Sequence, residues 1–105
     1  MGFIEILKDL IPYRFTMSLE GETWGFEIRY NAEHDYFTID LLKDDEVLVA
    51  GEKIVYGNPL FAGYADRKPA VTIVPFDLSD EASRAGWNEV GETVFLYLMD
   101  GDTDE

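Results

Sequence analysis

The stretch YRFTMSLEGETWGFEIRYNAEHDYFTIDLLKDDEVLVAGE, residues 13–52, decides the fold, because its apolar residues recur at every second position. The alternating positions are Phe15, Met17 and Leu19, then Trp24, Phe26, Ile28 and Tyr30, then Phe37, Ile39 and Leu41. A period of two places such side chains on one face of a β-sheet. Polar turns at 20–22, 31–35 and 43–46 separate the runs. We therefore expect a four-stranded meander with one apolar and one polar face.

The segments on either side of the meander predict three further strands. Residues 93–99 form the most apolar run, and their lack of alternation is typical of a strand buried on both faces. The β-branched run 70–74 predicts a short strand that Pro75 ends. Residues 3–7 fit a strand; they also fit a helical face that continues to Ile11, although Pro12 disfavours the helix.

The chain is therefore expected to be all-β, a small antiparallel β-barrel or sandwich of about seven strands with at most one short helix. The helix candidate is a single turn, for which Ser79 to Ala82 give a weak N-cap signal. A length of 105 residues predicts one domain. We assign residues 1–99 to a single β domain and residues 100–105 to an acidic, flexible C-terminal end.

Charge and composition exclude several classes of function. The chain has 22 acidic and 8 basic residues, no cysteine and one histidine, and its formal net charge is -14. Such a surface repels phosphate backbones and anionic lipids, so we expect no direct nucleic-acid binding and no membrane partner. Disulfides and cysteine-ligated metals are excluded. The N-terminus does not resemble a signal peptide, and no apolar run is long enough to span a membrane.

The chemistry-bearing motifs are weak. His34 and Asp35 invite an acid–base interpretation, but they lie in a turn where an exposed histidine is the ordinary case. A serine triad would need this histidine beside one of three serines that all lack a nucleophile-elbow motif, Ser18, Ser79 and Ser83. We therefore expect no enzyme activity, no catalytic residue, no cofactor and no small-molecule ligand.

The C-terminal residues Asp100 to Asp104 resemble the opening of a calcium loop. Such a loop needs glycine at its sixth position, which is Glu105 here, and it needs a glutamate six residues later. The sequence therefore predicts an acidic end and no metal site.

Aromatic residues are the remaining candidates for binding. Phe61 and Tyr64 lie in the loop 56–64, which contains two glycines and a proline, and they either form a protein interface or cap the end of the barrel. A ligand-binding β-sandwich is an alternative. It would need exposed aromatic rings beside a groove, for which the candidates are Trp24, Trp87 and Tyr64.

Three stretches occur in a fixed order: IPYRF at 11–15, LVAGEKIVYGNPL at 48–60 and GETVFLY at 91–97. A hairpin strand of the F-x-I-x-Y-N kind lies at 26–31, and the central stretch follows the pattern V-A-G-x-x-[LI]-V-x-G-x-P-L. Together they resemble the phage baseplate plug family of contractile-tailed phages and prophage elements, over about residues 4–99. The central stretch is the most specific part.

The resemblance implies a small, mainly β structural virion protein at the distal end of the tail tube. It also implies contacts with hub, spike and tape-measure proteins, and a location in the virion tail baseplate after assembly in the host cytoplasm. Four positions carry over from the motif as fold determinants: Gly51, Gly57, Pro59 and Leu60. A free acidic interaction module, either an inhibitor or a DNA mimic, is a further alternative, because the net charge suits a basic partner.

Overall fold

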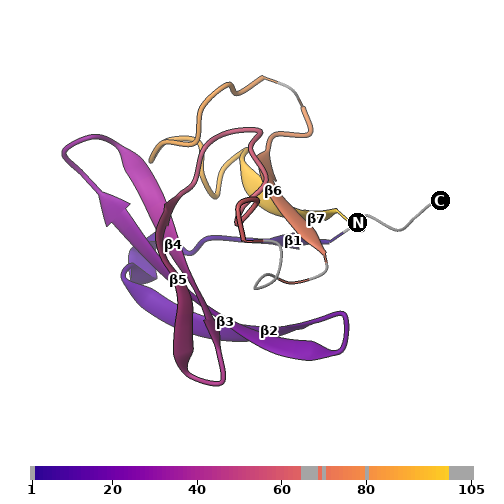
Figure 1. Ribbon diagram of the computed structural model, residues 1–105. Coiled ribbons are helices and arrows are strands. Elements are labelled where there is room, and N and C mark those ends of the chain that lie inside the picture. The colour runs from indigo at the N-terminus through magenta and orange to yellow at the C-terminus, as the bar shows by residue number, and fades with distance from the viewer. Residues whose placement is uncertain (1, 65–68, 70, 80, 100–105) are drawn as a thin grey trace.

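The computed structural model describes residues 2–64, 69, 71–79 and 81–99, and within them the chain is all-β, as predicted (Figure 1). The elements in chain order are β1 (Phe3–Ile4), η1 (Lys8–Leu10, a 3-10 turn), β2 (Tyr13–Leu19), β3 (Glu22–Asn31), β4 (Tyr36–Lys43), β5 (Glu46–Lys53), β6 (Thr72–Phe76) and β7 (Phe95–Met99). No helix among the described residues is long and apolar enough to cross a membrane.

The predicted meander is confirmed as a four-stranded antiparallel sheet in the order β2-β3-β4-β5. Two of its turns are tight. Glu20 and Gly21 link Leu19 to its partner Glu22, and both have positive φ, 54° and 82°. Asp44 and Asp45 repeat this arrangement with φ of 53° and 69°. Two central residues with positive φ match the right-handed twist of the flanking strands, which is why such turns suit hairpins.

The second sheet has the order β1-β7-β6 and is also antiparallel. The central position of β7 agrees with the apolar run from which it was predicted. The expectation that Pro75 ends β6 is wrong, since Pro75 pairs with Leu96 inside the strand. Its carbonyl faces away from β7 and accepts a hydrogen bond from Gly57. The proline nitrogen therefore also faces the outer edge of the sheet, where a missing N–H breaks no strand pairing.

The N-terminal segment forms a strand, the favoured prediction, over only two of the five residues expected, and no helix runs to Ile11. Only Phe3 and Ile4 pair as a strand, and the chain then turns through η1 before Pro12. The helical turn expected at Ser79 to Ala82 is not present among residues 77–79 and 81–85, and Asp80 lies outside the described residues.

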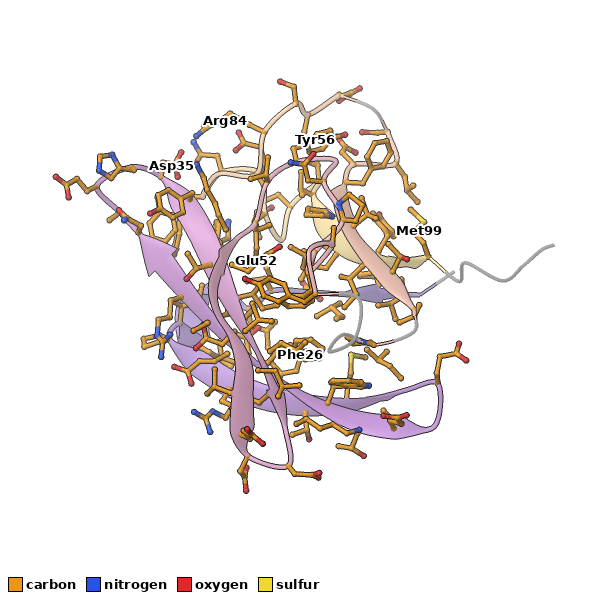
Figure 2. All side chains as sticks on the ribbon, viewed as in Figure 1. Phe26, Asp35, Glu52, Tyr56, Arg84 and Met99 are labelled. Carbon is orange, nitrogen blue, oxygen red and sulfur yellow. The ribbon has the colours of Figure 1, made fainter. Side chains whose placement is uncertain are left out.

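The two sheets share one hydrophobic core but do not close into a barrel. The meander contributes Phe26, Phe37 and Ile39, each 0% exposed, and the second sheet contributes Ile73 and Leu96. Figure 2 shows Phe26 between the sheets. In sheet order, β2 and β5 remain edges of one sheet and β1 and β6 remain edges of the other. Of the two predicted architectures, the structure is therefore the open, two-sheet one.

Candidate functional site

Residues 54–61, here named the bridging segment, connect the two sheets. At its start, the Ile54 N–H donates to the Phe37 carbonyl at 2.9 Å, which continues the pairing of β5 with β4. Ile54 itself is 2% exposed and belongs to the shared core. The segment therefore leaves the meander as an ordered, buried continuation of β5.

At its far end, the bridging segment covers the outer edge of β6. The Gly57 N–H donates to the Pro75 carbonyl at 2.8 Å, and the Leu60 N–H donates to the Ile73 carbonyl at 2.8 Å. Leu60 is also buried in the core. An uncovered edge strand leaves a row of backbone groups unpaired, and covering it with a loop is a common solution. The bridging segment thus satisfies β6 and joins the sheets on this side of the molecule.

A second contact anchors the bridging segment from β5. The Phe61 N–H donates to Oε2 of Glu52 at 2.9 Å, and Figure 2 shows Glu52 beside the segment. Phe61 has a φ of 62° and is 1% exposed. Its ring is in the core, which favours the alternative that Phe61 closes the end of the fold, and its part in an interface stays a prediction. Tyr64, at 43% exposure, does present a surface.

The four motif positions lie in or beside this junction. Gly51 and Gly57 have φ of 69° and 79°, and nothing lies within 4 Å of where a Cβ would stand. Backbone conformation rather than space is therefore what favours glycine here. Leu60 is buried, and Pro59 precedes it on the surface. Their role as fold determinants stays a prediction.

Gly51 forms a bulge that is held by a buried acid. Residues 50 and 51 face a single residue, Asp40, because the register passes from Ile39↔Glu52 to Leu41↔Val49. The Gly51 N–H donates to Oδ1 of Asp40 at 2.7 Å, and Asp40 is 5% exposed. A glycine in the left-handed region is typical of one bulge class. No local pattern around Asp40 or Gly51 indicated this pairing.

The outer face of the meander carries a ladder of alternating charges. Arg14 on β2 donates from Nε and Nη2 to Oε1 of Glu27 at 3.1 and 2.9 Å. Arg29 bonds the other oxygen of Glu27 and donates to Oδ2 of Asp40 at 2.9 Å. This confirms the predicted polar face. It also pairs each guanidinium with a carboxylate, while both arginine side chains stay about half exposed.

His34 and Asp35 do not form a catalytic pair. The Asp35 carboxylate accepts hydrogen bonds from the Tyr30 hydroxyl at 2.6 Å, from the Trp87 N–H at 2.9 Å and from Arg84. Figure 2 shows Asp35 and Arg84 side by side. The Tyr30 hydrogen bond, followed by those from Trp87 and Arg84, lowers the pKa of Asp35 to about 2. This carboxylate pins the 84–87 loop to the meander.

The candidate serines lack triad geometry among the described residues. Ser83 and His34 line the same shallow surface hollow, but no hydrogen bond joins them there. The Ser79 hydroxyl donates to Asp77 at 2.6 Å, and Ser18 lies exposed on β2. The described residues hold no cluster of three or more metal-ligating side chains, and the calcium-like run 100–104 lies outside them.

Asp77 is a buried carboxylate with an organising role. It is 2% exposed and accepts hydrogen bonds from the Ser79 hydroxyl and from the N–H groups of Ser79, Glu81 and Ala82. The Ser79 hydroxyl and these backbone groups lower the pKa of Asp77 despite its burial. A carboxylate that accepts hydrogen bonds from several nearby backbone N–H groups fixes the local chain as a turn. Sequence reasoning assigned this turn to Ser79 instead.

The aromatic residues proposed for a ligand-binding groove do not gather as a group of exposed rings. Trp24 is 7% exposed, and the Lys43 Nζ lies 4.4 Å from its ring centroid. Trp87 is 38% exposed and packs on Tyr30 and Phe37, with centroid distances of 4.8 and 6.0 Å. Trp24 therefore offers little ring surface to a ligand.

A family model described as "Cyanophage baseplate Pam3 plug gp18" matches residues 1–102. The chain belongs to this baseplate plug family. The match is longer than the resemblance over about residues 4–99 and includes the whole bridging segment. No curated protein matches the chain. Membership in the baseplate plug family supports a structural role in a phage tail baseplate, in association with other tail proteins.

The bridging segment generates a prediction about glycine. Gly57→Ala is expected to lower the free energy of unfolding by about 1–2 kcal/mol, because alanine is disfavoured in the left-handed region. Gly63→Ala is the matched control, since Gly63 is an exposed loop glycine outside that region with an equally open Cβ position. Its expected change is within about 0.5 kcal/mol. Equal losses in denaturant unfolding would contradict the assignment.

The Asp35 contacts predict a dependence of stability on pH. The pKa of Asp35 falls from an ordinary value of 3.8 to about 2 on folding, so its stabilisation is complete above pH 4 and is lost as the pH falls through 2. Asp35→Asn is therefore expected to lower the melting temperature most above pH 4, with the gap to wild type closing toward pH 2.

The control for Asp35 is Glu33→Gln, which removes an exposed charge from the same turn. Its melting temperature is expected to differ from wild type by less than that of Asp35→Asn above pH 4. A gap for Asp35→Asn that stays constant from pH 6 to pH 2 would show that the carboxylate's charge does not hold the 84–87 loop.

Proposed function

We propose that the chain is the plug at the distal end of a phage tail tube, where it contacts the hub, spike and tape-measure proteins. The family match over residues 1–102 carries this proposal. In this proposal the protein is assembled into the tail in the host cytoplasm and is located in the virion tail baseplate. The role is structural rather than enzymatic.

The architecture supports a passive, rigid part. Two sheets share one core, and the bridging segment ties them with backbone hydrogen bonds at both ends. The 84–87 loop is fixed to the meander through Asp35, and the 77–82 turn is fixed through Asp77. A part that closes a lumen needs such fixed loops and a surface for neighbours more than it needs a reactive pocket.

The charge supports a place beside a DNA channel. A net charge of -14 on 105 residues repels a phosphate backbone, so a plug of this kind would not hold the DNA that must pass it. In this account exposed acidic side chains lie toward the lumen. A baseplate structure in which the acids instead face the hub would remove this part of the proposal.

Cross-linking in purified tails tests the proposed place. A carbodiimide reagent joins carboxylates to lysines of neighbouring proteins, which suits a chain with 22 acids and few bases. The expected result is the recovery of cross-linked peptides between this chain and the hub, spike or tape-measure protein. Absence of the chain from purified tails would contradict the proposal.

The same experiment addresses the second candidate, a free acidic inhibitor or DNA mimic, which the net charge favours. Such a module would be recovered from infected cells on a basic host protein, in a complex that salt dissociates. That result, together with purified tails that lack the chain, would favour the acidic module over the plug as the function of the protein.

A further inference from the structure

The bridging segment joins the β5 edge of one sheet to the β6 edge of the other, and the two remaining edges, β2 and β1, are not joined by strand pairing in the described part of the chain. Between them lies a groove, here named the open seam, whose lining is mostly apolar. It comprises Phe3, Ile4, Glu5, Leu7, Tyr13, Phe15, Thr16 and Met17.

The open seam presents both exposed side chains and the outer parts of side chains that pack against the core. Phe3 is 50% exposed and Leu7 is 45% exposed, and Leu10 follows at 56%. On β2, Tyr13, Phe15 and Met17 are half-buried at every second position. Apolar groups with a period of two beside an unpaired strand edge suit an added strand, because its side chains alternate in the same way.

Charge around the open seam indicates the sign of the partner. Glu5 lines the groove, and Asp9 and Glu92 line a neighbouring hollow with it. The nearby basic groups are already paired: Lys8, which lines the same hollow, donates to the Trp87 carbonyl at 2.6 Å and lies 3.8 Å from Glu92, and Arg14 is bonded to Glu27. Glu5 and Asp9 have no ion-pair partner among the described residues, so the remaining charge beside the seam is negative. Two copies of a chain at -14 repel each other, which disfavours a second copy in the seam.

We propose that the open seam binds an extended, basic segment of another protein by adding it as a strand along β2. Apolar residues at alternate positions of that segment would contact Leu7, Phe15 and Met17, and its lysines or arginines would lie near Glu5. The added strand would lie between β1 and β2. The identification of the partner as a tail protein rests on the proposed function, but the strand addition itself does not.

The test uses the full chain and a fluorescent peptide as long as β2, in which valine alternates with lysine and threonine. Fluorescence anisotropy at physiological salt is expected to show saturable binding. A peptide of the same sequence with every backbone amide N-methylated keeps the charge but can donate no strand hydrogen bond from either edge, and it is expected to bind at least about tenfold more weakly.

Two matched variants locate the site. Leu7→Ser is expected to weaken the unmodified peptide about tenfold, the fold-change for one aliphatic side chain that is buried on binding. Val47→Ser is the control: Val47 is 48% exposed, close to Leu7 at 45%, but it lies on β5 at the far edge of the meander. Its affinity for the peptide is expected to match wild type.

Three results would overturn the proposal: no binding, equal binding of the two peptides, or equal weakening by Leu7→Ser and Val47→Ser. A dimer in solution that Leu7→Ser dissociates would show that a second copy fills the open seam instead. None of these results depends on the composition of tails, so failure here is distinguishable from failure of the plug assignment.

Discussion

The bridging segment is the constraint on which the rest of the structure depends. A three-stranded sheet whose first strand has two residues is small, and its β6 edge needs cover. Gly57 and Leu60 supply that cover by donating to the carbonyls of Pro75 and Ile73. Leu60 and Phe61 then fill the space between the sheets. The sheets are thus fixed relative to each other by a loop rather than by a shared strand.

The strands of the meander could be predicted from local sequence patterns, whereas the contacts between residues far apart in the sequence could not. Period-two alternation and turn residues locate four strands because both signals are local. Nothing local shows that Asp35 contacts Arg84 and Trp87, about fifty residues away, or that Asp40 holds the Gly51 bulge. The prediction that Pro75 ends β6 was wrong for a related reason. Whether a proline ends a strand depends on whether its missing N–H would face a neighbouring strand.

The candidate site differs from the sequence expectation in a consistent way. Residues suspected of chemistry or contact serve the fold: Asp35 holds the 84–87 loop, and Phe61 is in the core. Asp77, which the sequence analysis did not single out, holds a second turn. Three of the exposed apolar side chains, Phe3, Leu7 and Leu10, lie on the N-terminal segment, where residue spacing had indicated only a choice between strand and helix. A family of structural baseplate proteins fits a chain whose buried carboxylates, Asp40 and Asp77, hold its backbone in place.

Native-state hydrogen exchange of the Leu60 amide tests most directly whether the bridging segment joins the sheets. If the bond to Ile73 holds them together, this amide exchanges only through global unfolding, with the same free energy as amides in the centre of β3 and β4. An opening free energy well below that of β3, near that of exposed loop amides, would contradict the account. The sheets would then be held by core packing alone.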